Sequence, residues 1–248
     1  MTRPPLFDSF PQDPWNGQII TILCKDICQY PSSIRNVLFI RTMTTGAWMD
    51  KIELDRSIGV TRICYTVDKH NVSKSVHPDT RIVDHSSIKD MLFDKHGMFD
   101  LICLDPFHEY SESRQDLELC VSVFLNDDGI VLCHDCLPAS LELSTASYTY
   151  GAWCGVTYAA FVDVAYHYPD FGYTVLAVDT GIGILTKHHH SLGKDYIREL
   201  CFTKRSLDRT KQEKMLTLLK KREYNRLYEY YVSHGTDIIN RIDVGCRF

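Results

Sequence analysis

The stretch Phe99-Asp-Leu-Ile-Cys-Leu-Asp-Pro-Phe-His-Glu-Tyr110 combines a short apolar run with an abrupt acidic end. Runs of this kind form strands that are buried inside a parallel sheet with both faces covered. We therefore expect a strand that ends at Asp105, with His108 three residues later. In open α/β sheets the ligand crevice lies just beyond the carboxyl ends of the strands, so both side chains are predicted to face it.

Four other apolar runs flank this stretch and have the length and composition of strands. They cover residues 36–41, 61–67, 81–83 and 129–133, and other segments separate them. Residues 173–186 are typical of a β-hairpin, which adds one antiparallel edge strand. This order predicts a three-layer α/β fold around a mostly parallel, Rossmann-like sheet.

The segments between the strands have the apolar spacing of helices. We expect helices over residues 18–28, 47–56, 88–93, 111–124 and 153–166. The turn 84–87 is expected to cap the third of these through side-chain oxygens. Residues 137–151 are rich in Ser, Thr and Tyr and predict a mobile loop that faces the substrate.

The ends of the chain differ in character from this central part. We divide the chain into an N-terminal cap over residues 1–34, the α/β domain over 35–187 and a helical extension over 188–248. In the extension, residues 221–231 predict a helix with a tyrosine-rich face. That face needs a partner, either within the chain or in a second subunit, so these helices are a candidate homo-oligomer contact.

The composition limits the classes of function. The chain has 248 residues, a formal net charge of −5 and a pI near 6.1, which argues against nucleic-acid binding and favours a small-molecule substrate. The N-terminus lacks a signal-peptide pattern, and no run approaches the roughly 20 apolar residues that span a bilayer. A cytoplasmic protein without membrane contact is therefore expected.

The ten cysteines are expected to be reduced and structural. Cys64, Cys103 and Cys133 fall inside apolar runs, where cysteine behaves as a small hydrophobic residue. Cys133 and Cys136 form a CxxC, but zinc sites usually need a second pair of ligands, and the chain shows no second pair at such spacing.

Ionisable residues follow two of the predicted strands. Asp105 ends one strand, and His134 and Asp135 follow another. If the two strands are adjacent, these side chains meet at one sheet edge, which suits a divalent cation. The alternative is that the acids only cap helices and that His108 is an ordinary surface histidine.

Two further residues have the positions of nucleotide-binding residues. Asp68 ends the second strand, where a carboxylate can accept both hydroxyl protons of a ribose. Gly46 lies in the turn after the first strand, but phosphate-cradling loops usually carry two or three glycines. Both residues are also common in plain turns.

Several motifs occur in a fixed order along residues 35 to 187. They are Asp68, Asp105-x-x-His108-x-Tyr110 with a following Asp116, Gly129-Ile-Val-Leu-Cys-His-Asp-Cys-Leu-Pro138, Gly151-Ala-Trp-Cys-Gly-Val-Thr-Tyr158 and Val178-Asp-Thr-Gly-Ile-Gly-Ile184. This order resembles the class I S-adenosylmethionine-dependent methyltransferases. The similarity is closer to the small-molecule and sugar O-methyltransferase branch, which includes macrolide-sugar methyltransferases and cephalosporin-hydroxylase-like proteins.

The resemblance implies a seven-stranded sheet and a chemistry for the sheet edge. In that branch, acids that end the fourth and fifth strands hold magnesium, and a histidine three residues after the first acid acts as the base. Matched positions here are Asp105, His134 and Asp135 for the metal and His108 for the base. The implied reaction is methyl transfer to a hydroxyl of a small molecule, a sugar being one candidate.

The resemblance also implies S-adenosylmethionine as the cofactor. Gly46 would lie against its methionine part, Asp68 would hold the ribose, and His85 and Ser86 would border the adenine. Asp105 is a further expected cofactor contact.

Two alternative functions remain open. Relatives usually carry Glu-x-Gly-x-x-x-Gly after the first strand, whereas Ile40 and Thr42 replace the acid and the first glycine when the chain is aligned on Gly46. This loss favours a methyltransferase-like fold retained as a non-catalytic binding or assembly subunit. Metal-dependent hydrolysis at the same cluster is the other alternative. Converging charged residues favour an enzyme over a scaffold, because unpaired buried charges are costly.

Overall fold

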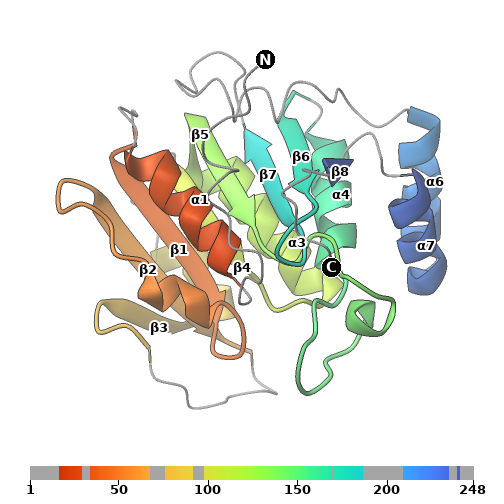
Figure 1. Ribbon diagram of the computed structural model, residues 1–248, viewed down its shortest axis with the longest axis horizontal. Coiled ribbons are helices and arrows are strands. Elements are labelled where there is room, and N and C mark those ends of the chain that lie inside the picture. The colour runs from red at the N-terminus through yellow and green to blue at the C-terminus, as the bar shows by residue number, and fades with distance from the viewer. Residues whose placement is uncertain are drawn as a thin grey trace.

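The computed structural model describes residues 17–29, 34–67, 76–91, 98–168, 170–186, 209–234 and 239–240. A single twisted sheet forms the centre of the molecule (Figure 1). Its strands are β1 (Asn36–Thr42), β2 (Gly59–Thr66), β3 (Thr80–Asp84), β4 (Phe99–Asp105), β5 (Leu125–Cys133), β6 (Gly172–Leu176), β7 (Ile182–Thr186) and the two-residue β8 (Ile239–Asn240).

The strand order is β3-β2-β1-β4-β5-β7-β6-β8. All neighbouring pairs are parallel except β5–β7 and β6–β7, because β7 returns from β6 as a hairpin. The first seven strands therefore confirm the predicted mostly parallel, Rossmann-like sheet. One detail of the prediction is wrong, since the antiparallel strand lies between β5 and β6 and not at the edge.

Helices cover both faces of the sheet, which gives the three predicted layers. Figure 1 shows α1 crossing one face, α3 and α4 on the opposite face, and α6 and α7 beyond α4. The helices are α1 (Gln18–Gln29), α2 (Ile88–Met91), α3 (Tyr110–Leu119), α4 (Thr157–His167), α6 (Arg209–Lys220) and α7 (Tyr224–His234). Shorter turns are η2 (Ala47–Lys51), η3 (His85–Ser87), η5 (Cys120–Phe124) and η6 (Glu142–Ser144).

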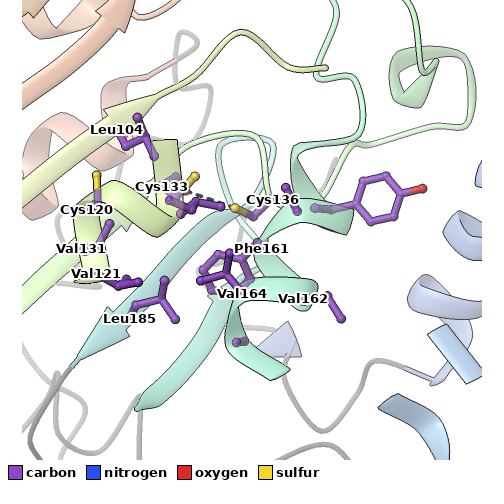
Figure 2. Close-up of a cluster of buried hydrophobic side chains, with 14 of the residues drawn as sticks. Leu104, Cys120, Val121, Val131, Cys133, Cys136, Phe161, Val162, Val164 and Leu185 are labelled. Carbon is purple, nitrogen blue, oxygen red and sulfur yellow. Dashed lines mark hydrogen bonds between the residues drawn. The ribbon is translucent and has the colours of Figure 1, made fainter. Parts of the chain in front are cut away.

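The core is divided by the sheet into two parts. Along β4, Leu101 and Cys103 face the α1 side, whereas Ile102 and Leu104 face the α3 and α4 side. This alternation follows from the two-residue period of a strand. Figure 2 shows the larger part, in which Phe161 of α4 lies among side chains from the sheet and from the segment 120–121.

Two local predictions are wrong in detail, and a third is confirmed. The helix expected over 47–56 is only the 3-10 turn η2, because the buried Arg62 guanidinium donates to the carbonyls of Met49 and Ile52. The helix expected over 111–124 is confirmed, since α3 ends at residue 119 and continues as the π-helix η5 to Phe124. Asp84 does not cap η3 through its side chain, which instead accepts a hydrogen bond from Thr66.

The cysteines behave as predicted wherever the structure describes them. Eight of the ten are free and buried, including Cys133 and Cys136 of the CxxC. The sulfur of Cys136 contacts the carbonyl oxygen of Cys133 in the core (Figure 2).

The tyrosine-rich face of α7 packs within the chain. Tyr231 is fully buried and stacks on Tyr158 of α4, with ring centroids 5.3 Å apart. Its hydroxyl donates to the carbonyl of Cys136, and the hydroxyl of Tyr228 donates to that of Pro138. The helix therefore supports the segment that follows β5.

Among the described residues, no helix combines the length and the apolar character that crossing a membrane requires.

Candidate active site

The carboxyl ends of β1, β4 and β5 meet at one edge of the sheet. Arg41 of β1 pairs in register with Asp105 of β4, and Leu104 pairs with Cys133 of β5. The backbone N–H of His134 donates to the carbonyl of Leu104 at 2.9 Å, which extends the pairing by one residue. Asp105, His134 and Asp135 thus lie together, as the sequence predicts.

Asp105 is buried and has defined partners on both carboxylate oxygens. The indole N–H of Trp48 donates to Oδ2 at 2.7 Å, and Nε2 of His108 lies 2.9 Å from Oδ1. Burial opposes ionisation, yet the hydrogen bond from His108 and the nearby charge of His134 lower the pKa of Asp105 below its usual range. Asp105 is therefore a carboxylate at neutral pH.

His108 is fixed by its two ring nitrogens. Nδ1 lies 2.6 Å from the carbonyl oxygen of Trp153, which can only accept, so Nδ1 carries a proton. Nε2 lies 2.9 Å from Asp105 and 3.1 Å from Asp135. Burial disfavours the imidazolium, but the charge of Asp135 and the hydrogen bond to Asp105 raise the pKa of His108. With Nδ1 already protonated, the two carboxylates therefore favour a proton on Nε2 as well.

Asp135 reaches the site because the backbone bends sharply after β5. Its φ is 60°, in the left-handed region that non-glycine residues rarely adopt. The hydroxyl of Thr180 in the β6–β7 turn hydrogen-bonds its carboxylate. The N–H groups of Cys136 and Leu137 donate to the carbonyls of Gly181 and Thr180, both at 2.8 Å. The β6–β7 turn thus holds the segment that carries Asp135.

His134 lies behind the two carboxylates, with 1 % of its surface exposed. Its Nδ1 lies 3.4 Å from Oδ2 of Asp105 and 3.3 Å from Oδ2 of Asp135 but makes no hydrogen bond. On the other side of the ring, Nε2 lies 3.5 Å from Oδ1 of Asp179. The charge of Asp135 raises the pKa of His134 well above its ordinary value, although burial opposes this.

A cavity of about 530 Å³ opens above this cluster. Asp105, His108 and Asp135 lie among its lining residues, and Gly46 and Lys51 line it from the β1 side. Four aromatic side chains complete the lining: Trp48, Tyr148, Tyr150 and Trp153. The volume is in the range that suits a small organic ligand.

The cluster has donor atoms for a metal ion. One ligand atom from each of Asp105, His108 and Asp135 lies within 4.8 Å of the others, and all three residues are buried. Carboxylate oxygens suit hard divalent cations, whereas imidazole nitrogen favours transition metals. The unpartnered Nδ1 of His134 is a further buried donor atom at the same place. The residues present therefore fit a divalent ion.

The loop after β1 has the shape required for a close approach to the cluster. Gly46 has a φ of 68°, and a Cβ atom there would lie 2.6 Å from Cβ of Arg41 and 3.0 Å from Cβ of Asp105. A side chain at this position would therefore fill the space next to the carboxylate. The preceding loop is closed by Thr42, whose hydroxyl lies 2.9 Å from the hydroxyls of both Thr44 and Thr45.

That His85 and Ser86 border the adenine stays a prediction. Neither His85 nor Ser86 lines the cavity, and Ser86 is exposed. Nε2 of His85 lies 2.7 Å from a carboxylate oxygen of Asp116, and its ring lies 4.5 Å from that of Tyr65. Asp68 lies outside the described residues.

The pair formed by His85 and Asp116 belongs to a buried network that reaches the loop between β4 and α3. The hydroxyl of Tyr65 donates to Asp116 at 2.5 Å and accepts the backbone N–H of Phe107 at 2.8 Å. Because Phe107 directly precedes His108, the network holds the segment that positions that imidazole.

Several contributors were not predicted from the sequence. Trp48, Trp153 and Thr180 contact the cluster from segments that are far from it in the chain. Trp48 falls in one predicted helix and Trp153 in another, and although Trp153 also belongs to a motif that carries the resemblance, the sequence predicts no role in the site for either residue. Asp179 accepts the N–H groups of Gly17, Ile19 and Ile20 at the start of α1, and only the folded structure shows this contact.

No family model matches the sequence, and no curated protein matches it. In a comparison with solved structures, the chain is similar to the crystal structure of SAH-bound methyltransferase PaMTH1 from Podospora anserina. The TM-score is 0.46 and the sequence identity 15%, over 73% of this chain and 83% of that chain.

Proposed function

We propose that the protein transfers a methyl group from S-adenosylmethionine to a hydroxyl of a small molecule, with the help of a divalent metal ion. One observation carries the proposal: Asp105, His108 and Asp135 converge on the floor of a ligand-sized cavity beside Gly46. The motif order and the methyltransferase-like sheet add support. Both support a site at one sheet edge, where the loop that carries Gly46 meets the acids and His108.

The metal would be held by the carboxylates of Asp105 and Asp135, with His134 as the third predicted ligand. A bound divalent ion lowers the pKa of a coordinated hydroxyl and fixes its orientation. The indole N–H of Trp48 orients the Asp105 carboxylate, and Thr180 orients that of Asp135.

His108 would act as the base in its neutral form, with its one proton on Nδ1 facing the carbonyl of Trp153, and the proton of the substrate hydroxyl would move to Nε2. S-adenosylmethionine would supply the methyl group to the hydroxyl oxygen, and its sulfonium would leave as a neutral thioether with the electron pair of the broken carbon–sulfur bond. The resulting imidazolium is stabilised by Asp105 and Asp135, which lie 2.9 Å and 3.1 Å from Nε2. Trp153 keeps the ring aligned by accepting from Nδ1 at 2.6 Å.

The lining of the cavity supports a small-molecule substrate. Its aromatic side chains offer flat apolar contacts, and only the floor is acidic. Trp48 and Trp153 are nearly buried, whereas Tyr150 is 98% exposed and is free to contact a ligand at the mouth. This arrangement can exclude water from the reacting atoms when a ligand fills the cavity.

Calorimetric titration with S-adenosylhomocysteine tests the cofactor assignment. We expect a saturable heat for the wild-type protein, and for Asp135→Asn as a matched control, since Asp135 is assigned to the metal. The absence of heat at millimolar ligand would refute the cofactor assignment and favour the non-catalytic subunit. Turnover that requires a metal but not S-adenosylmethionine would instead identify a hydrolase.

A further inference from the structure

A second cavity, of about 610 Å³, is lined by residues of α3, α4, α6 and α7. It is separate from the cavity of the candidate active site, because the two have no lining residue in common. The proposed methyl transfer gives this second cavity no role. Its volume is in the range of small-ligand sites, so its lining is informative about what it could bind.

The cavity is lined by one buried carboxylate, whose charge is already balanced. Asp163 is 5% exposed and accepts the hydroxyl of Tyr110 at 2.6 Å and Nε of Arg114 at 2.7 Å. Nδ1 of His167 lies 3.3 Å from the other oxygen of Asp163. The remaining nitrogens of Arg114 pair with Glu118. A cationic ligand would therefore find this carboxylate already occupied.

Two cations of the lining lack such partners. Lys220 ends α6, Arg222 follows two residues later, and both side chains are exposed. Neither side chain forms a hydrogen bond or an ion pair with another described residue. With Arg114, they give the lining three cations against the carboxylates of Glu109 and Asp163. The excess of positive charge favours an anionic ligand.

Arg222 also occupies a position where glycine would be less costly. Its φ is 56°, in the left-handed region. The N–H groups of Arg222 and Glu223 donate to the carbonyls of Leu219 and Leu218, at 2.9 Å and 3.0 Å. In this pattern of hydrogen bonds at a helix end, the residue with the positive φ is usually glycine. The helix dipole explains Lys220 in the last turn, but it does not explain an arginine in this conformation.

The remaining lining provides an apolar surface beside the two cations. Leu216 and Leu219 are buried side chains of α6, and the ring of Tyr224 lies at the start of α7. Ala146 lines the cavity from the loop after η6. A ligand that fits this lining has an apolar part as well as a negative charge.

We propose that this cavity binds a small amphiphilic anion, with its carboxylate or phosphate group at Lys220 and Arg222 and its apolar part against Leu216 and Leu219. The arginine fork can hold two oxygens of such a group, and the lysine adds a compact charge. This site is distinct from the one that carries the proposed methyl transfer, so neither depends on the other.

The test is calorimetric titration of the full chain at low ionic strength. The probes are phenyl phosphate, benzoate and inorganic phosphate. Lys220→Gln and Arg222→Gly each remove one of the two cations. Lys214→Gln is the matched control, because Lys214 is exposed on the same helix but does not line the cavity.

We expect saturable binding of phenyl phosphate or benzoate, and the tighter of the two identifies the charged group. It should bind at least about tenfold more tightly than inorganic phosphate, which lacks an apolar part. Lys220→Gln and Arg222→Gly should each weaken binding at least about fivefold, and Lys214→Gln by less than about twofold. Arg222→Gly should melt no earlier than wild type, since glycine suits this backbone, so its loss of affinity would not reflect unfolding.

Three results would overturn the proposal. The first is no saturable heat with either aryl anion at millimolar concentration, which needs no variant to fold. The second is equal weakening by all three substitutions, because only the net charge of the protein would then act. The third is wild-type affinity in Arg222→Gly, which would place the anion elsewhere.

Discussion

Replacement of Tyr231 by alanine should destabilise the protein strongly. The side chain is fully buried, stacks on Tyr158 and donates to the carbonyl of Cys136 at 2.9 Å. Truncation of a buried aromatic residue costs about 3–5 kcal/mol, and the lost hydrogen bond adds about 1 kcal/mol. Since domains are stable by about 5–15 kcal/mol, this is a large fraction of the total.

Two matched variants separate the contributions. Tyr231→Phe keeps the ring and loses only the hydroxyl, so its cost should be about 1–2 kcal/mol, because the Cys136 carbonyl is left without that donor. Glu229 lies on the exposed face of the same helix, so Glu229→Ala should change the free energy of unfolding by less than about 0.5 kcal/mol.

The assay is urea unfolding, followed by circular dichroism at several protein concentrations. A Tyr231→Ala cost equal to that of Glu229→Ala would refute the packing of α7 on α4. If the tyrosine face instead bound a second subunit, the unfolding midpoint would rise with protein concentration. A midpoint that is independent of concentration supports the contact within one chain.

Three further predictions follow from the site and its supports. Burial opposes the charged form of His85, but the hydrogen bond to Asp116 raises the pKa of His85. The pair therefore stabilises the folded protein fully below about pH 6.5, and this stabilisation is lost as the pH rises through the raised pKa of His85. His85→Gln should therefore cost about 1 kcal/mol more at pH 6 than at pH 9 in urea unfolding. Trp48→Phe removes a donor to Asp105 and should weaken Mn²⁺ binding about tenfold by calorimetry. Gly181→Ala would place a Cβ 2.1 Å from a backbone nitrogen at a φ of 89°, so thermal unfolding should show a loss of at least about 2 kcal/mol.

Each of these has an outcome that contradicts it. A cost of His85→Gln that is equal at both pH values would mean that the imidazole is neutral throughout. Unchanged Mn²⁺ affinity in Trp48→Phe would separate the indole from the metal site. A Gly181→Ala protein as stable as wild type would show that the β6–β7 turn tolerates a side chain.

The sheet could be predicted because its strands carry a local signal. The apolar run from Phe99 to Leu104 is buried on both faces, and it ends at Asp105 as expected. Adjacent parallel strands bring their carboxyl ends to one edge, so Asp105 and Asp135 were expected to meet if their strands are neighbours, and the pairing of β4 with β5 confirms this. Turn and helix boundaries were less accurate, because contacts from elsewhere decide them. Arg62, for example, takes the carbonyls that a longer helix after Gly46 would have used.

The support of the site could not be predicted, because it comes from residues distant in the chain. The indole N–H of Trp48 reaches Asp105 across 57 positions, and the carbonyl of Trp153 reaches His108 across 45. The position of neither tryptophan in the sequence identifies the residue that it contacts. A fold-level prediction names the strand ends but not the side chains that orient them.

The conformation of Asp135 connects the hairpin to the chemistry. A non-glycine residue in the left-handed region costs of order 1–2 kcal/mol, and such a cost persists only where neighbours enforce it. Here the β6–β7 turn enforces it through two backbone hydrogen bonds and the hydroxyl of Thr180. The same turn contains Thr180 itself and Asp179 in the left-handed region, with Asp179 anchored to α1. A plain turn after β5 would need none of this, whereas a carboxylate that must face Asp105 and His108 requires the chain to bend at that residue. The antiparallel hairpin therefore acts as a positioning element for the acidic floor of the cavity.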